Sequence, residues 1–397
     1  MSIAAPELSP AGLRRVLAVL CVTEVTSWGV LYYAFPVLAP SIAADTGWSV
    51  GETTAAFSLG LVVSALLGIP AGRLLDRRGP RVLMATCSAL AVPAVAGIAL
   101  AGSLPLFFAA WVLAGVAMAG TLYPPAFAAL TRWWGSRRVT ALTTLTLLAG
   151  LSSTVFAPLT ATLLGHLGWR DTYLVLAVVL GVITIPAHLL GLRGPWPAAE
   201  PSPATGTPDS IVRSRPFVLL VVAVGLGAFT AFAVVVNQVP LLIDRGLSTT
   251  AAAWALGLGG IGQVLGRLGY GRLAAIAPRP RAVLVLGVMA LTTAGLGLLP
   301  GPVGLLVAVA MLTGAARGVF TLLQATAVSD RWGTEHYGRL GGILSAPAMV
   351  ATAVAPWAGA VLAGALGGYP ALFLLLAAVA VVAALLAAGT GVEHRGS

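Results

Sequence analysis

Arg317 is a charged residue in the middle of a long apolar run, residues 303–328. Thr313, Thr321 and Gln324 stand at positions i−4, i+4 and i+7 from it, so a helix would place all of these side chains on one face. A guanidinium at the centre of a membrane helix costs about 2.5–3.5 kcal/mol, so its presence calls for a compensating role. We expect this stripe to bind an anion, as substrate or counter-ion, or to form a buried structural pair.

Arg267 forms a second polar stripe, with Gln263 and Tyr270, in the apolar run 250–271. A guanidinium and a neighbouring amide offer several N–H donors to a carboxylate. Arg267 lies one turn from the end of its run, however, and a long arginine side chain in that place can also reach the membrane surface. Anion binding and a surface role both remain open for it.

Glu24 lies in the first apolar run, 15–39, with Ser27 and Trp28 one turn further on. A carboxyl group in apolar surroundings prefers to be neutral, which makes Glu24 a candidate proton carrier. A structural pair between Glu24 and one of the two arginines is an equally good interpretation.

Several neutral polar residues in apolar runs could orient a ligand, although polar contacts between helices are the commoner reason for such residues. Asn237 and Gln238 stand next to each other, and Tyr33 and Tyr123 lie in two other runs. The predicted substrate-binding residues are therefore Arg317, Arg267, Gln263, Asn237, Gln324, Tyr33 and Tyr123.

The elements that must position these residues are membrane helices, because 58% of the 397 residues are hydrophobic and only 9% are charged. A bilayer core of about 30 Å needs roughly 20 apolar residues per helix, and lipid excludes irregular backbone. The sequence contains twelve such runs, which predicts an all-α membrane protein with twelve spans. The runs are 15–39, 53–72, 82–101, 106–130, 140–164, 172–192, 217–242, 250–271, 282–300, 303–328, 340–363 and 370–389.

The runs divide into six and six around residues 193–216, which are rich in Pro, Ala, Ser and Thr. We therefore expect an N-terminal six-helix bundle over 1–192, a cytoplasmic linker over 193–216 and a C-terminal six-helix bundle over 217–397. Duplicated halves of this kind are typical of transporters. Gly72-Arg73-Leu74 recurs at 271–273, Trp134-Gly135 at 332–333, and Pro158 at position 356.

The net charge of +10 records membrane topology rather than nucleic-acid binding. All 22 basic residues are arginines. Arg170 and Arg245 fall on one side, Arg267 and Arg317 lie within runs, and the remaining 18 (22 − 4) fall on the other side or in the tails. This positive-inside bias predicts a multi-pass inner (plasma) membrane protein with both termini in the cytoplasm.

The loop after the second run reads Gly72-Arg-Leu-Leu-Asp76-Arg77-Arg-Gly79-Pro-Arg81. It resembles the Gly-x-Leu-x-Asp-Arg-x-Gly-x-Arg loop motif of the major facilitator superfamily at every specified position. Glycine at 72 permits close approach of two helices, and the Asp76 carboxylate can accept from N–H groups at a helix N-terminus. The resemblance implies a cytoplasmic latch between two bundles, with Gly72, Asp76, Arg77, Gly79 and Arg81 as its gating residues. In the second half Ala275 replaces the aspartate, so we expect a weaker latch there or none.

Two stretches resemble the monocarboxylate and oxalate transporter branch of that superfamily. One is Tyr33-Ala-Phe-Pro36, and the other comprises Trp133-Trp134, Arg137-Arg138, Ala149-Gly150, Pro158-Leu159 and Gly168-Trp169-Arg170. In those carriers a proton-handling lysine follows the Tyr-Ala-Phe-Pro run, and an Asp and an Arg stand four residues apart in the eighth helix. Here Val37 takes the place of the lysine, and Gln263 and Arg267 stand for the acidic and basic pair. The resemblance implies anion recognition by Arg267 and a central cavity lined by the tenth helix with Arg317, without the usual proton coupling.

Three kinds of function remain. The first is a monomeric secondary transporter that moves a small organic anion, such as a carboxylate, by alternating access. A proton or a counter-substrate is the candidate coupling species. The second is proton-coupled efflux of drug-like compounds, although Ala157-Pro158 replaces the Gly-Pro pair that is frequent in such exporters. The third is a transporter-like sensor, which would need a soluble signalling segment. An enzyme, a cofactor and a metal site are not expected, because the 4 histidines are scattered and no nucleotide loop or nucleophile triad occurs.

Overall fold

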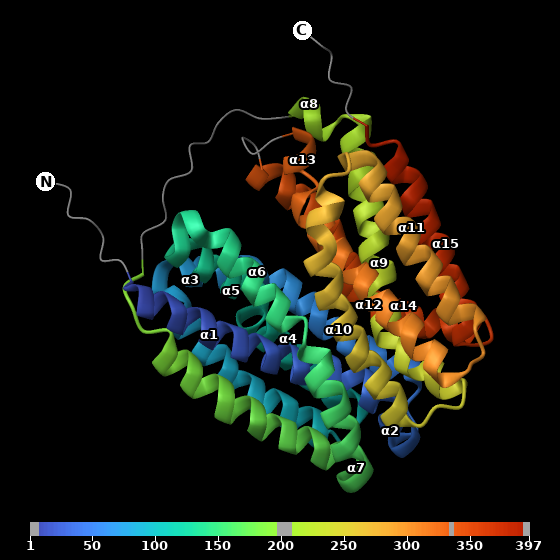
Figure 1. Ribbon diagram of the computed structural model, residues 1–397. Helices are drawn as coiled ribbons and strands as arrows, with labels where there is room; N and C mark the ends of the chain where they lie inside the picture. The colour runs from blue at the N-terminus through green and yellow to red at the C-terminus, as the bar shows by residue number, and fades with distance from the viewer. Residues whose placement is uncertain (1–7, 197–208, 333–336, 392–397) are drawn as a thin grey trace, which may run out of the picture. The chain divides into compact units, whose positions relative to one another are not determined.

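The computed structural model describes residues 8–196, 209–332 and 337–391, and these residues form helices joined by short turns (Figure 1). The chain divides into two compact units, residues 1–202 and 203–397. Each unit has a hydrophobic core of its own. The predicted all-α membrane fold is confirmed, whereas the predicted bounds of the two bundles and of the linker stay predictions.

The first unit consists of long helices interrupted by short tighter or wider turns. They are α1 (Pro10–Trp28), the π-helical turn η1 (Gly29–Tyr33), α2 (Ala34–Thr46), α3 (Val50–Leu100), α4 (Leu104–Thr121), α5 (Tyr123–Trp134), the 3₁₀ turn η2 (Gly135–Arg137), α6 (Arg138–Ala149), α7 (Ser152–Pro186) and the π-helical turn η3 (Ala187–Gly191).

Two of these helices bend sharply at a glycine. Gly79 in α3 has φ 75° and ψ 169°, and Gly168 in α7 has φ 77° and ψ 171°. Only glycine adopts these angles without strain, so each glycine divides its helix into two arms. The arms of α3 match the predicted spans 53–72 and 82–101, and the second arm of α7 together with η3 covers the predicted span 172–192 up to Gly191.

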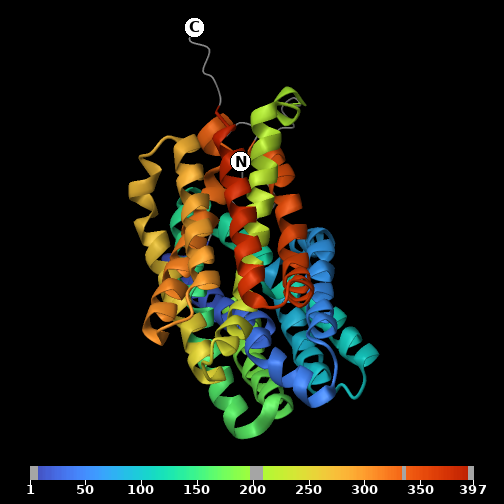
Figure 2. The same cartoon turned by 90° about the vertical axis from the view of Figure 1, so that its right-hand side faces the viewer.

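The second unit contains straighter helices. They are α8 (Asp209–Val212), α9 (Arg215–Asp244), α10 (Thr249–Ala274), α11 (Pro278–Leu298), α12 (Val303–Thr326), α13 (Ser329–Trp332), α14 (Tyr337–Ala365) and α15 (Tyr369–Ala388). Helices α9, α11 and α15 run side by side, and Figure 2 shows the red α15 next to the yellow-green α9. Helix α9 begins at Arg215, inside the predicted linker, of which residues 197–208 lie outside the described residues.

Helix ends follow local sequence signals. Ser9, Ser214 and Ser248 each accept a hydrogen bond from a backbone N–H of the first turn, and Ser49 forms a capping box with Glu52. Gly47 ends α2 with φ 72°, a left-handed cap that glycine adopts at low cost. These signals set where the helices start and stop, which polarity alone does not.

Among the described residues, nine helical segments are long and apolar enough to cross a membrane. Two of them, Val50–Leu100 and Thr140–Gly191, are long enough for more than one passage, since they contain the bends at Gly79 and Gly168. Large apolar side chains such as Leu66, Val182 and Leu291 are about 70% exposed, as expected for surfaces that face lipid. The chain is thus a multi-pass membrane protein, and the number of twelve spans stays a prediction.

Candidate functional site

The backbones of α10 and α12 come into direct contact along a seam of glycines. A Cβ added to Gly262, Gly314 or Gly318 would lie less than 3.0 Å from a carbonyl oxygen of the facing helix. Small residues at three- and four-residue spacing allow such close approach in membrane helices. The seam therefore fixes the register of α10 against α12, and with it the positions of the side chains that flank the glycines.

This register brings Arg317 of α12 next to Gln263 of α10. The Arg317 Nη2 donates to Gln263 Oε1 at 2.9 Å, and the two residues are only 9% and 6% exposed. Two arginine stripes that the sequence suggested separately are thereby joined, because Gln263 belongs to one and Arg317 to the other. In the described part of the chain, Arg317 takes part in no ion pair, so its only described partner is a neutral amide.

The other members of the Arg317 stripe do not support its guanidinium. The Thr313 hydroxyl donates to the Val309 carbonyl at 2.8 Å, and the Thr321 hydroxyl donates to the Arg317 carbonyl at 3.0 Å. Both hydroxyls therefore satisfy their own helix, as is common for threonine in apolar helices. Gln324 is half-buried, two turns beyond Arg317.

A small cavity lies against Arg317 inside the second unit. The volume open to the centre of a water molecule is about 20 Å³, which corresponds to one water-sized species. Its walls come from α9, α10, α11 and α12, and its polar lining residues are Thr230, Gln238, Thr293, Thr313 and Arg317. Gln238 is 4% exposed, and its Nε2 has no hydrogen-bond acceptor.

The remaining predicted residues of the second unit lie apart from this cavity. Asn237 is 1% exposed, donates to the Ala233 carbonyl at 2.8 Å and packs against Gly359 of α14. Arg267 is 6% exposed, one turn from Gln263, so it is buried and does not extend to the surface. The Tyr270 hydroxyl shares a 2.8 Å hydrogen bond with Thr326 of α12.

In the first unit Glu24 is completely buried in α1. Within the described residues neither carboxyl oxygen has a hydrogen-bond partner, and the indole of Trp28, one turn further on, is the neighbouring donor. In the described part of the chain, Glu24 forms no ion pair. A buried carboxylate without a partner is strongly disfavoured, so the environment suits a protonated carboxyl or a bound cation.

An aromatic cluster surrounds the segment that follows Glu24. Trp28 has ring centroid distances of 5.4 Å to Tyr32 and 5.0 Å to Tyr123, and Tyr32 lies 5.2 Å from Tyr33. The π-helical turn η1 carries Tyr32 and Tyr33, and Tyr123 begins α5 directly after the break at the end of α4. Interrupted helices of this kind frequently mark functional positions in membrane proteins. The predicted Tyr33 and Tyr123 thus both belong to the cluster next to Glu24.

The loop around Asp76 makes contacts that the motif alone did not indicate. The Asp76 carboxylate pairs with Arg132 of α5, and not with backbone N–H groups at a helix start. The Arg132 guanidinium also stacks over the Trp196 ring, 4.7 Å from its centroid. Arg81 donates from Nε to the Leu189 carbonyl at 2.8 Å, and Arg77 is exposed.

The two motif glycines serve different purposes. Gly79 needs its left-handed φ of 75°, and a Cβ there would lie 3.3 Å from Trp196. A Cβ at Gly72 would meet no atom within 4 Å, so Gly72 does not serve the close helix packing within its unit that we expected.

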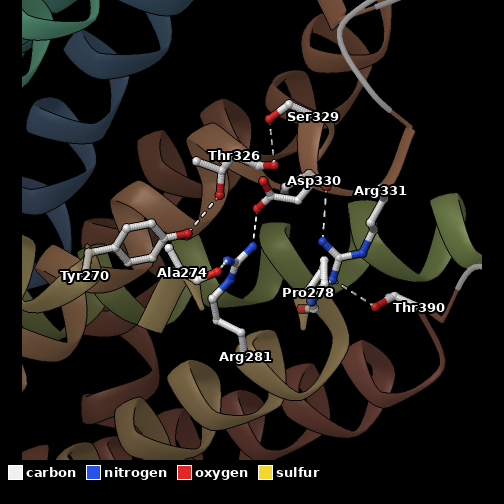
Figure 3. Close-up of polar contacts among 10 residues, drawn as sticks. Tyr270, Ala274, Pro278, Arg281, Thr326, Ser329, Asp330, Arg331 and Thr390 are labelled. Carbon is white, nitrogen blue, oxygen red and sulfur yellow. Dashed lines mark hydrogen bonds and ion pairs between the residues drawn. The ribbon is translucent and has the colours of Figure 1, made fainter. Parts of the chain in front are cut away.

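A matching end of the second unit carries an ion pair as well. Arg281 of α11 pairs with Asp330 of α13 and donates to the Ala274 carbonyl at 3.1 Å (Figure 3). The Arg331 guanidinium donates to the carbonyl groups of Ala327 and Pro278 and to the Thr390 hydroxyl, at 3.0–3.1 Å. Arg281 and Asp330 thus supply an ion pair inside this unit, whereas the weaker latch expected from Ala275 stays a prediction.

Arg281 and Arg331 are only 3% and 8% exposed, and the sequence analysis treated them merely as inner-side arginines. Burial lowers the pKa of Arg331 to about 10, an effect that the neighbouring Asp330 charge opposes and the Arg281 charge reinforces. The signal that could have found the pair was the repeat, because Asp330 occupies the position that corresponds to Arg132 at the offset of 198 (330 − 132) set by Trp134 and Trp332.

The chain is similar in sequence and fold to known membrane transporters. A family model described as the Major Facilitator Superfamily matches residues 20–305. Monocarboxylate transporter 13 of Bos taurus is 31% identical over 379 residues, which are 92% of this chain and 83% of that protein. Multidrug resistance protein MdtL of Shigella dysenteriae is 29% identical over 230 residues, 55% of this chain and 57% of that protein. The crystal structure of a bacterial homologue of the human lysosomal transporter Spinster has a TM-score of 0.71 at 16% identity and covers 95% of both chains.

Proposed function

Because the chain belongs to the Major Facilitator Superfamily, and is thus a secondary transporter of a small molecule in a lipid bilayer, we propose that its substrate is a small organic anion with a carboxylate group. The observation that carries this proposal is the buried Arg317, whose described hydrogen-bond partner is the neutral Gln263 and whose surroundings provide further N–H and O–H donors. A carboxylate would supply the negative charge that a buried guanidinium requires. The similarity to a monocarboxylate transporter supports the same substrate class.

Within this proposal Arg317 and Gln263 bind the carboxylate, and Arg267, one turn along α10 from Gln263, adds positive charge to the same region. Transport proceeds by alternating access. Asn237, Gln324, Tyr33 and Tyr123 remain candidates for contacts with the rest of the substrate.

The test is uptake of a radiolabelled monocarboxylate into proteoliposomes. We expect Arg317→Gln to lower the initial rate at least about tenfold, equivalent to 1.4 kcal/mol of lost interaction, because glutamine retains hydrogen bonding without the charge. Arg317→Lys should keep part of the flux, since lysine retains the charge but not the planar fork. A thermal melt of each variant checks that the fold survives. Parental flux in Arg317→Gln would refute the assignment of this residue.

We further propose that Glu24 carries a coupling proton. Its carboxyl is fully buried without an ion pair in the described residues, so taking up and releasing a proton would change the stability of its surroundings strongly. Val37 stands where the similar carriers have a lysine, so a proton site elsewhere in the first unit is needed for coupling. Glu24→Gln should abolish the acceleration of uptake by an inward proton gradient while counterflow exchange of substrate continues.

Drug efflux is a second candidate function, and two observations favour it. The chain is similar to a multidrug resistance protein over about half its length, and the Glu24 carboxyl adjoins the aromatic cluster of Trp28, Tyr32 and Tyr123. Aromatic faces and a carboxylate together attract lipophilic cations. A deletion strain that becomes sensitive to cationic dyes, with unchanged growth on carboxylates, would favour efflux over the anion proposal.

The arginine distribution supports a plasma membrane location with both termini in the cytoplasm, and we propose that the protein acts as a monomer. Impermeant labelling of single cysteines introduced next to Arg170 and next to Arg137 tests the topology. Only the cysteine next to Arg170 should react from outside intact cells.

A further inference from the structure

The cavity beside Arg317 has the lining of a site for one small anion. Arg317 contributes a guanidinium, Gln238 an Nε2 amide without an acceptor, and Thr293 a hydroxyl. Among the described residues that line the cavity, none is a carboxylate. The wall is therefore dominated by hydrogen-bond donors next to a fixed positive charge, which is the environment that anions require.

The charge balance of the second unit points in the same direction. Of its described acidic side chains, Asp330 pairs with Arg281, and Asp244 stands at the end of α9 and does not line the cavity. A buried guanidinium costs several kcal/mol unless a negative group compensates it. Gln263 Oε1 supplies one lone pair but no charge, and the Arg317 Nε has no acceptor. The surroundings of Arg317 are thus one negative charge short.

The volume of the cavity restricts what can supply that charge. About 20 Å³ of space for a water-sized centre suits a single atom and is too small for an organic acid. Since Thr313 and Thr230 use their hydroxyl hydrogens on backbone carbonyls, at 2.8 and 3.5 Å, the remaining donor groups of the lining belong to Arg317, Gln238 and Thr293. Three donors from three different helices can surround one ion.

From these observations we propose that the second unit binds a halide ion, chloride under physiological conditions, in the cavity between Gln238, Thr293 and Arg317. The ion neutralises Arg317 in the conformation of this structure, in which the cavity is too small for an organic anion. This inference shares Arg317 with the proposed function but does not depend on carboxylate transport, because a protein that moves another substrate would need the same counter-charge.

The first experiment measures thermal unfolding of the purified full-length protein in detergent while chloride replaces methanesulfonate at constant ionic strength. Methanesulfonate is too large for the cavity. We expect the midpoint to rise by a few degrees with chloride and to saturate, because a ligand that binds only the folded state stabilises it. An identical midpoint in both salts at every concentration would overturn the proposal.

Matched variants locate the effect. Arg317→Gln and Gln238→Leu should remove the chloride-dependent shift, and Thr293→Val should weaken it. Thr292→Val is the control, because its hydroxyl donates to the Val288 and Met289 carbonyls and it does not line the cavity. A shift that persists in Arg317→Gln would place the chloride elsewhere and refute this site.

The second experiment is diffraction from crystals grown in bromide, with an anomalous peak expected next to Arg317. Density for water alone in the cavity would refute the inference. The two proposals fail separately. If the parent protein transports no carboxylate but its melting midpoint still rises with chloride, only the proposed function is contradicted. If it transports a carboxylate but shows no effect of halide, only the halide site is contradicted.

Discussion

The two units share a backbone design to a degree that their side chains do not. Gly60 and Gly115 of the first unit correspond to Gly259 and Gly314 of the second at one offset, 199 residues (259 − 60 and 314 − 115). In each unit the second glycine of the pair has its Cα directly against the carbonyl oxygen of the first. The same device therefore holds α3 against α4 and α10 against α12.

The chemistry placed on these seams differs completely. The residue that corresponds to Arg317 is Met118, which is fully buried, and the residue that corresponds to Gln263 is Ser64 (118 + 199 and 64 + 199). Conversely, the buried Glu24 of the first unit corresponds to Ala223 (24 + 199). A transporter needs one substrate site and not two, so duplication preserves the contacts that set helix register and leaves the polar groups free to diverge.

Each unit also carries an ion pair at one end, and the acidic and basic partners lie on different elements in the two units. In the first unit the aspartate lies in the α3 loop and the arginine in α5, whereas in the second the arginine lies at the start of α11 and the aspartate in α13. Burial also differs. The Asp76 and Arg132 side chains are 54% and 18% exposed, whereas the Asp330 and Arg281 side chains are 27% and 4% exposed. The second pair is thus a structural clamp inside its unit, while the first is accessible to partners and solvent.

Replacing Asp330 or Asp76 by asparagine should give the largest difference in stability between the two units. Asp330→Asn leaves the buried Arg281 without a counter-charge, and we expect a loss of about 3–5 kcal/mol in unfolding free energy. Asp76→Asn should cost no more than about 1 kcal/mol, because exposed pairs contribute little. Denaturant unfolding of the purified variants, followed by tryptophan fluorescence, measures both.

Equal destabilisation by the two substitutions would contradict this distinction between clamp and accessible pair. Arg281→Gln combined with Asp330→Asn provides the control, since removing both charges should recover much of the stability lost in Asp330→Asn alone.

Substitutions on the glycine seams should have the next largest effect, and the same effect in both units. Gly115→Ala and Gly314→Ala each place a methyl group against a backbone carbonyl, which cannot rotate away, and we expect a loss of about 3 kcal/mol in each case. Gly287→Ala is the control, because a Cβ there meets no atom within 4 Å and alanine favours the helix. A parental melting midpoint for Gly314→Ala would show that the seam is looser than the contacts indicate.

The sequence predicted those features that depend on polarity and on single-residue signals. In the second unit the apolar runs placed the long helices to within four residues, whereas in the first unit the breaks between α4 and α5 and between α6 and α7 fall inside predicted spans. Arg317, Gln263 and Glu24 were recognised because polar groups inside such runs are rare. The sequence could not predict that Gln263 accepts a hydrogen bond from Arg317 of the facing helix, since that depends on the register of α10 against α12. Arg317 and Arg267 were expected at one shared cavity, and a contribution of both arginines to it stays a prediction.

The repeat also extends to helix ends and to glycines with left-handed backbone angles. Ser49 and Ser248 both cap helices, and Gly168 and Gly367 both have left-handed φ values, 77° and 81°, each at the same offset of 199 (248 − 49 and 367 − 168). The Arg281–Asp330 pair was missed for another reason. Only one of its positions is shared with the first unit: Asp330 corresponds to Arg132, whereas Arg281 lies six residues beyond Ala275 (281 − 275), the counterpart of Asp76. A search for the aspartate of the motif at Ala275 therefore finds nothing.

The helix-end glycines Gly47 and Gly246 test the shared backbone design through the smallest expected change in stability. They correspond at an offset of 199 (246 − 47), have φ values of 72° and 87°, and would meet no atom within 4 Å if a Cβ were added. Substitution by alanine should therefore cost only the left-handed backbone strain, about 1–2 kcal/mol in either unit. Gly47→Asn and Gly246→Asn should cost less than alanine, because asparagine tolerates this conformation, whereas a packing defect would make the larger side chain worse. Melting midpoints that fall further for asparagine than for alanine would show that steric contacts, and not the backbone angle, require glycine at these two ends.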